Sequence, residues 1–201
     1  MVEREVTPPD GHHFVWAGEF ENQQRAMRRL SIVVPLSVLI VFGLLFTALG
    51  SARTASTVLV ITPFAMTGGV FALLLFDINL SVSAAIGFIA LLGQVSLAAL
   101  LVLGAIEEHR RAGLPMDVAI TRGARDRFRA VLMTALLAML GLAPMAVSSG
   151  VGSETQRPFA VVLIGGMVTT LSMVLFVLPA VYAAIAPREL RSPALDGEQE
   201  G

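Results

Sequence analysis

The stretch LSVSAAIGFIALLGQVSLAALLVLGAI, residues 80–106, decides the fold of this chain. It contains no charged side chain, and it exceeds the ~20 apolar residues that an α-helix needs to cross a bilayer. Four further apolar runs lie at residues 30–49, 57–76, 128–147 and 159–186. Backbone polar groups must be satisfied internally in lipid, so each run is expected to be a helix. The sequence therefore predicts an all-α integral membrane protein, a bundle of five transmembrane helices.

The composition supports a membrane protein. Hydrophobic residues make up 55% of the 201 residues and charged residues only 14%, and the mean hydropathy is +0.78. A water-soluble chain with five such helices would lack the polar faces to cover them. The net charge of -1 provides no basic surface, so no nucleic-acid partner is expected. Because the chain has no Cys, disulfides, zinc–thiolate sites and cysteine nucleophiles are excluded.

Residues 1–29 form a polar N-terminal segment. The sequence TPPDG at 7–11 is typical of a turn, residues 12–17 are compatible with a short strand, and residues 19–30 indicate a helix that leads into the membrane. At the other end of the chain, residues 187–201 are expected to be a disordered cytoplasmic tail.

The connections between the runs differ in length. Those at 50–56 and 77–79 are so short that neighbouring helices must return as antiparallel hairpins. Residues 107–127 are long enough for a separate cytoplasmic surface helix, and Pro115 suits its first position. The residues expected on one face of that helix are Met116, Ala119, Ile120 and Gly123. A polar loop is expected at 148–157.

Orientation follows from the arginines near the ends of the runs, because short cytoplasmic loops retain positive charge. Placing residues 107–127 in the cytoplasm brings most of these arginines to that side, with the N-terminus outside and the C-terminus inside. The cluster Arg25, Arg28 and Arg29 opposes this orientation. An outside N-terminal segment without a signal peptide is difficult to translocate, so we expect the chain to be the tail of something longer.

Several motifs follow one another along the membrane part of the chain. They are GFIALLG at 87–93, RAVLMTA at 129–135, LAPMAVSSGVG at 142–152, QRPFA at 156–160 and IGG at 164–166. Their order resembles the C-terminal membrane half of resistance-nodulation-division (RND) efflux pumps. ETQRP at 154–158 is most similar to the heavy-metal efflux subfamily, the Czc and Cus type. WAGEFENQQRA at 16–26 resembles the family's descent from its periplasmic domain.

The resemblance implies a proton-driven homotrimer of the bacterial inner membrane with twelve transmembrane helices in two halves. A periplasmic adaptor and an outer-membrane channel would complete the pump. The five runs would be its eighth to twelfth helices, and residues 1–29 would include a remnant of a periplasmic domain. The partners of this chain would then be the lipid bilayer and the remaining half of the transporter.

Charged side chains within a bilayer are usually functional, yet the interiors of the five runs contain none. By resemblance, Ala98 and Leu97 stand where family members carry Asn, Asp or Glu, and Val131 stands where copper exporters have Lys. Thr134 matches a threonine beside the family's proton relay. Arg127 matches an arginine at the cytoplasmic start of the eleventh helix.

Gln94 and Ser96 are the polar groups midway along the third run. The candidates for a proton pathway are therefore Thr134, Gln94, Ser96 and Arg127. In the plainer interpretation, the hydroxyl and amide groups hold helices together, at about 1 kcal/mol or less each, and Arg127 fixes the topology. Helix packing is favoured for Gln94 and Ser96, and both interpretations stay open for Thr134 and Arg127.

No metal site and no cofactor are expected. Met133, Met139 and Met145 are six residues apart, so successive members turn by about 120° and do not share a helix face. His12 and His13 are adjacent in the expected strand and would point to opposite sides.

Small residues and prolines are assigned architectural roles. Glycines at 68–69, 165–166 and 141 are expected to allow close helix approach. Pro63, Pro144 and Pro179 are expected to interrupt helical hydrogen bonding.

The leading hypothesis is the C-terminal membrane portion of a heavy-metal cation efflux pump, inactive alone. The alternative is a truncated or orphan membrane fragment with a structural role only. An enzyme is disfavoured, since no carboxylate pair, histidine cluster or activated nucleophile shares a membrane depth. The sequence does not name the transported metal, because the family's selectivity residues lie in parts absent from this chain.

Overall fold

The computed structural model describes residues 19–150 and 152–185, without the side chains of residues 19–24 and 185. Within these ranges every regular element is a helix and no strand is formed. The elements are α1 (Glu19–Leu49), α2 (Ala52–Leu75), α3 (Val82–Arg111), α4 (Met116–Val147), α5 (Ser153–Ser172), the π-helical turn η2 (Met173–Val177) and α6 (Leu178–Ile185). The expected lead-in helix is the beginning of α1. The turn at 7–11, the strand at 12–17 and the tail at 187–201 lie outside the described residues.

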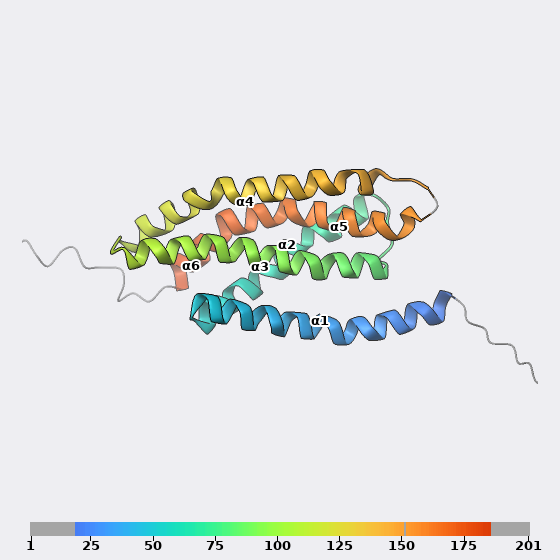
Figure 1. Ribbon diagram of the computed structural model, residues 1–201, viewed down its shortest axis with the longest axis horizontal. Coiled ribbons are helices and arrows are strands. Elements are labelled where there is room, and N and C mark those ends of the chain that lie inside the picture. Colours follow the sequence, from blue (N-terminus) through green and yellow to red (C-terminus); the bar gives the residue numbers. More distant parts are fainter. Residues whose placement is uncertain (1–18, 151, 186–201) are drawn as a thin grey trace, which may run out of the picture.

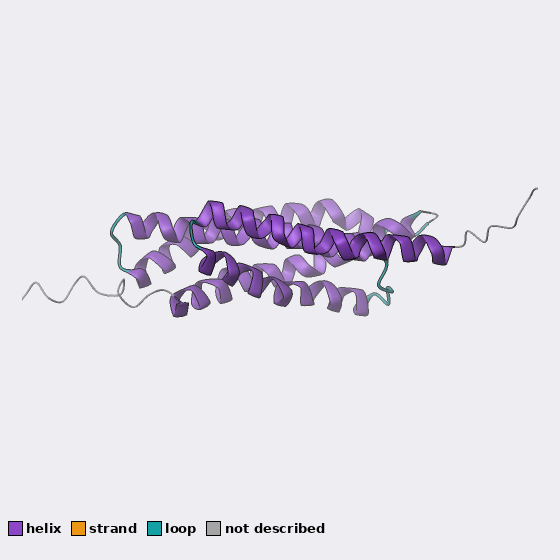
Figure 2. Ribbon diagram, turned by 90° about the horizontal axis from the view of Figure 1, so that it is seen from below, coloured by secondary structure: helices purple, strands orange, loops and turns teal. Residues whose placement is uncertain are grey.

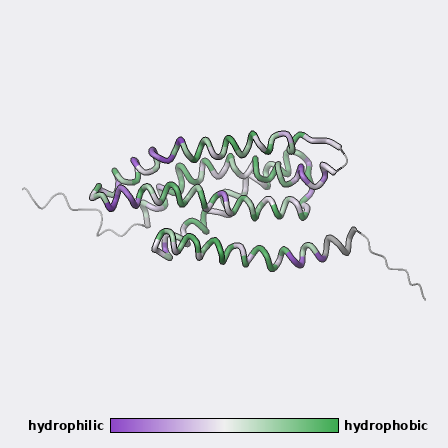
Figure 3. The backbone as a smooth tube through the Cα atoms, in the orientation of Figure 1, coloured by the Kyte–Doolittle hydropathy of each residue, from purple (hydrophilic) through white to green (hydrophobic). Residues whose placement is uncertain are grey.

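Five helical stretches in the described part of the chain are long and apolar enough to cross a membrane. They are Arg25–Leu49, Ala52–Leu75, Val82–Arg111, Met116–Val147 and Ser153–Ala184, the last formed by α5, η2 and most of α6. Apolar residues predominate along the middle of the bundle, and polar residues gather near its two ends (Figure 3). The predicted all-α membrane bundle of five helices is confirmed.

The helices run side by side, and their connections lie at the two ends of the bundle (Figure 2). Each connection contains one residue with a positive φ: Gly50, Asp77, Gly113 and Gly152. Serine side chains cap the two helices that follow short connections. Ser51 Oγ accepts a hydrogen bond from the Thr54 N–H at 3.4 Å, and Ser81 Oγ accepts one from the Ala84 N–H at 3.3 Å. Local capping therefore starts α2 and α3 where the hydropathy pattern placed the turns.

Helices α2, α3 and α5 form the core of the bundle, while α1 and α4 flank it. In Figure 1, α1 lies at one edge beside α3, and α4 lies at the opposite edge. Only 6% of the most apolar window of α1 and 11% of that of α4 is buried, against 39–44% for the other three spans. Helix α3 supplies the largest set of fully buried side chains, namely Leu91, Val95, Val102, Leu103 and Ile106. The two flanking helices thus leave broad apolar faces uncovered.

Glycine pairs bring α2 and α5 into backbone contact. A Cβ built on Gly68 would lie 2.4 Å from the Gly165 carbonyl oxygen. Gly166 instead allows α5 to approach α3, because a Cβ there would lie 2.2 Å from Leu91 Cδ2. The expected close approach is therefore confirmed for residues 68–69 and 165–166. It is wrong for Gly141, where a Cβ would have no described neighbour within 4 Å because that face of α4 is uncovered.

The prediction of a separate surface helix at 107–127 is wrong in its boundaries. Helix α3 continues to Arg111, and α4 begins at Met116, after Pro115 as predicted, but then runs without interruption to Val147. No Gly or Pro separates the charged residues from the apolar ones, so hydrogen bonding propagates through the boundary. The predicted face is confirmed: Met116 and Ala119 are buried, and Gly123 packs on the backbone of Ile106.

The three prolines affect their helices differently. Helices α2 and α4 continue through Pro63 and Pro144. Before Pro179, the helix widens into η2, and the Leu178 N–H bonds to the Met173 carbonyl, five residues back. Since Pro179 cannot donate a hydrogen bond, a local π-helical turn accommodates it within a continuous span.

Candidate functional site

Thr134 lies on an exposed part of α4, within the span Met116–Val147. Its hydroxyl donates to the carbonyl oxygens of Ala130 at 3.1 Å and Val131 at 2.9 Å, both in its own helix. These bonds satisfy the donor and leave the oxygen able to accept a further hydrogen bond. Thr134 therefore does not join helices of the described bundle, but it is accessible to a group that approaches α4 from outside.

Gln94 and Ser96 lie on opposite sides of α3, because residues two apart in a helix are separated by about 200°. Ser96 is buried, donates to the Leu92 carbonyl at 2.7 Å and lines a groove of about 200 Å³ between α1 and α3. Gln94 is half-buried and makes no hydrogen bond within the described residues. The structure does not bring these two side chains together in one site.

Arg127 lies in α4 directly before the apolar run at 128–147 and takes part in a set of charge pairs that joins α4 to α3. Its Nη2 is 4.0 Å from Glu108 Oε2. Beside this pair, His109 Nε2 and Asp126 Oδ2 are 2.7 Å apart. Both pairs cross from the end of α3 to α4 over the connection at residues 112–115. The sequence alone does not indicate them, because the pairing depends on where α3 ends and α4 begins.

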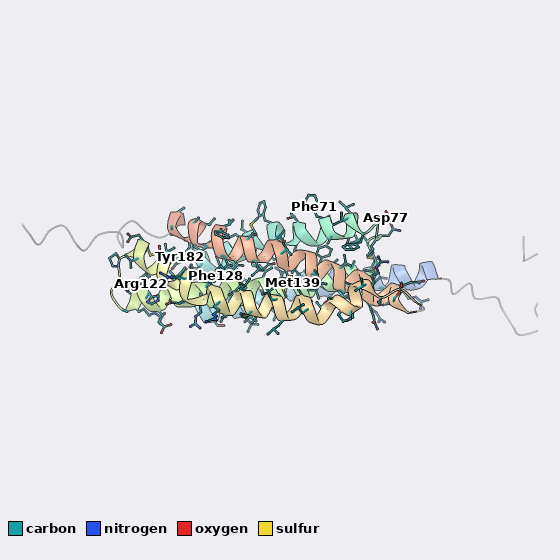
Figure 4. The ribbon with its side chains drawn as sticks, turned by 90° about the horizontal axis from the view of Figure 1, so that it is seen from above. Phe71, Asp77, Arg122, Phe128, Met139 and Tyr182 are labelled. Carbon is teal, nitrogen blue, oxygen red and sulfur yellow. The ribbon has the colours of Figure 1, made fainter. Side chains whose placement is uncertain are left out.

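A second charged group at the same end was not predicted as a site. Glu107 Oε1 accepts hydrogen bonds from Arg110 Nη2 at 2.9 Å and from Arg111 Nε at 3.2 Å, and Arg110 Nε lies 2.9 Å from Glu107 Oε2. The three side chains line a cavity of about 380 Å³ together with Arg53 and Tyr182. Figure 4 shows Tyr182, Arg122 and Phe128 gathered at this end, with Asp77 at the opposite end.

Arg157, in the first turns of α5, carries an unusual buried atom. Its Nε is buried and has no hydrogen-bond partner within residues 19–150 and 152–185. A buried donor without a partner is costly, so such an atom normally meets a partner in the complete assembly. Among the described residues, no group of three or more His, Cys, Asp or Glu side chains is placed to hold a metal ion.

The helical bundle, the uncovered apolar faces of α1 and α4, and the uncharged interiors of the apolar runs are those of a segment that spans a membrane several times. Residues 1–186 match the AcrB/AcrD/AcrF family. The chain belongs to this family.

Curated relatives of the chain carry names of metal resistance. The chain is 46% identical over 187 residues to the nickel and cobalt resistance protein CnrA of Cupriavidus metallidurans, covering 93% of this chain and 17% of the relative. It is 44% identical over 197 residues to the nickel-cobalt-cadmium resistance protein NccA of Alcaligenes xylosoxydans xylosoxydans, covering 98% and 18%. The chain thus spans less than a fifth of the length of these relatives.

A solved structure shares the arrangement of helices. A crystal structure of a heavy metal efflux pump superimposes with a TM-score of 0.76 at 40% identity, covering 92% of this chain and 19% of that chain. The predicted membership in the heavy-metal RND group is confirmed by these relatives. Together with the five spans, they define a multi-pass membrane protein of a transporter family.

Proposed function

We propose that this chain forms the C-terminal transmembrane portion of a proton-driven heavy-metal cation efflux pump in the bacterial inner membrane. The observation that carries the proposal is the 44–46% identity, over nearly the whole chain, to relatives named for resistance to nickel, cobalt and cadmium. In this proposal the N-terminal end of α1 faces the periplasm and the end of α6 faces the cytoplasm. The chain has no enzymatic role and binds no cofactor.

The uncovered face of α4 is the proposed contact with the rest of the pump. It exposes Met133, Leu137 and Leu140, whose exposed fractions are 49%, 70% and 70%. Thr134 is accessible beside this apolar surface. Since the apolar interiors of the five runs carry no acid, the proton-binding carboxylate has to come from the remaining half, and Thr134 would accept or relay its proton.

The composition of the wider assembly is inferred from the family to which the chain belongs. The complete pump would be a homotrimer joined to a periplasmic adaptor and an outer-membrane channel. Arg157 lies in the first turns of α5, at the end of the bundle proposed to face the periplasm, and its buried Nε has no hydrogen-bond partner among the described residues. It is a natural contact for a part of the pump that these residues do not include.

A chimaera tests the proposal. The segment of the nickel and cobalt resistance protein CnrA that matches this chain is replaced by this chain, and nickel resistance is measured in a strain without its own pump. We expect the chimaera to restore resistance and CnrA without this segment to fail. A chimaera with Gly165→Leu, which blocks the contact of α5 with α2, is the inactive control.

The second candidate is a membrane segment with a structural role only, which the lack of ionisable residues in the span interiors favours. It predicts that Thr134→Val leaves the resistance of the chimaera unchanged. The proposal fails if CnrA without the segment is active. It also fails if the chimaera is inserted at normal levels and confers no resistance.

A further inference from the structure

The charged cavity at the end of α3 opens between three parts of the bundle. It has a volume of about 380 Å³ and lies between the α1–α2 connection, the last turn of α3 and α6. Its polar lining consists of Ser51, Arg53, Thr54, Glu107, Arg110, Arg111 and Tyr182. Three arginines and one glutamate give this lining an excess of two positive charges. Such an excess in a cleft of this size favours an anionic ligand.

The arginines keep donors available for such a ligand. Glu107 engages Arg110 through Nη2 and Nε, and Arg111 through Nε. Because a guanidinium has five N–H donors, both side chains retain unused ones. Arg53 is exposed, and no acidic side chain of the described residues lies within salt-bridge distance of it. The free donors match the oxygens of a phosphate group, which arginine binds in a bidentate manner.

A separate apolar groove, which shares Arg53 with this cavity, lies along the membrane span. It has a volume of about 610 Å³, and its lining is mostly apolar. Val60 and Phe64 of α2 form one wall, and Met173, Val177 and Val181 form the other. Arg53 borders both the cavity and the groove. One molecule with a charged head and an apolar tail would fill both spaces.

We propose that this joined site binds one anionic phospholipid, with its phosphate beside Arg53 and Arg111 and an acyl chain in the groove. The arginines and Tyr182 lie at the end of the spans, where arginine and aromatic side chains meet the headgroups of a bilayer. A basic cleft between helix ends on the cytoplasmic side is suited to such a headgroup. Lipid binding at this site does not require transport. The lipid experiment therefore tests the site independently of the proposed function.

Native mass spectrometry of the 201-residue chain in detergent tests the site. The chain is titrated with phosphatidylglycerol and with phosphatidylcholine of the same acyl chains. We expect phosphatidylglycerol to bind more tightly. Arg53→Gln and Arg111→Gln should each lower its affinity about fivefold, because one arginine near a phosphate contributes on the order of 1 kcal/mol.

Two further variants and one competitor complete the test. Arg122→Gln is the matched control, since Arg122 is exposed at the same end but lines neither space. Val177→Trp narrows the groove and should weaken phosphatidylglycerol binding. Val177 is partly exposed, so the larger ring does not disturb the core. Inorganic phosphate should not displace the lipid.

Each opposite result overturns the proposal. Equal affinity for the two lipids, or equal losses in Arg122→Gln and Arg53→Gln, would mean that the arginines do not form a specific site. Unchanged binding in Val177→Trp would exclude the groove as the acyl-chain site. Displacement by inorganic phosphate would identify a site for a free anion.

Discussion

Gly68 on α2 and Gly165 on α5 face each other with no room for a side chain on either. A Cβ on Gly68 would lie 2.4 Å from the Gly165 carbonyl oxygen, and a Cβ on Gly165 would lie 2.6 Å from the Gly68 carbonyl oxygen. Beside them, the Thr169 hydroxyl donates to the Ala65 carbonyl and links the same two helices. In lipid, where helix association depends on packing rather than on the hydrophobic effect, this contact holds the centre of the bundle.

Replacing Gly165 by Leu should therefore separate α2 from α5. We expect a loss of about 1–3 kcal/mol or more in the free energy of unfolding in detergent, because overpacking forces the backbones apart. Gly104→Leu is the matched control, since a Cβ there would have none of the described atoms within 4 Å. Unfolding is followed by circular dichroism during denaturant titration. Equal stability of the two variants would contradict the role of the glycine contact.

Within the described part of the chain, the Thr134 hydroxyl bonds to carbonyl groups of its own helix, so its removal should not disturb the bundle. We expect Thr134→Val to change the stability of the isolated chain by less than about 0.5 kcal/mol. In the chimaera with CnrA, the same change should lower the rate of metal efflux roughly tenfold or more, because a proton-transfer group is lost. Thr134→Ser, which keeps the hydroxyl, should retain efflux. If both variants transport equally, the hydroxyl has no part in the proton pathway.

The His109–Asp126 pair joins α3 to α4 at an exposed position. A double-mutant cycle with His109→Gln and Asp126→Asn should give a coupling of about 0.2–1 kcal/mol, since water screens such pairs. The coupling should fall in 1 M salt, where the Debye length is about 3 Å. The free energy of unfolding is measured for all four chains at both salt concentrations. A coupling that does not respond to salt would contradict an ion pair.

The orientation of the chain can be tested with single cysteines, because the natural sequence has none. Asp77 and Arg122 lie at opposite ends of the bundle (Figure 4). We expect Asp77→Cys to react with an impermeant maleimide added to intact spheroplasts, and Arg122→Cys to react only after the inner membrane is opened. The reversed pattern would show that the arginines near the first helix, and not those of residues 107–127, set the topology.

The sequence predicted the five spans because bilayer thickness sets the length of each apolar run and lipid forces each run to be helical. It did not predict the continuity of α4. Hydropathy changes at residue 128, but backbone hydrogen bonding does not depend on hydropathy. Close helix approach was also predicted at both Gly141 and Gly68, since the two residues are chemically identical. Their neighbours differ, and neighbours are a property of the tertiary packing.

The candidate site was predicted less well than the fold. Thr134 and Arg127 were chosen by resemblance, and the structure puts them on α4 without a shared partner. Gln94 and Ser96 were grouped by depth in the membrane, although helical geometry separates them around α3. The cavity of Arg53, Arg110 and Arg111 was missed because it joins residues from three separate segments. No local pattern in the sequence indicates that residues from these separate segments lie close together in the fold.

The uninterrupted course of α4 has a mechanical consequence. Its 32 residues span roughly 48 Å at ~1.5 Å per residue, while the hydrocarbon layer is about 30 Å thick. More than a third of the helix therefore projects as a stiff rod beyond the lipid tails, carrying the ion pairs of Asp126 and Arg127. A force applied to that projecting end tilts the part of α4 within the lipid with it, so a movement at this end of the bundle reaches the bilayer centre without a hinge.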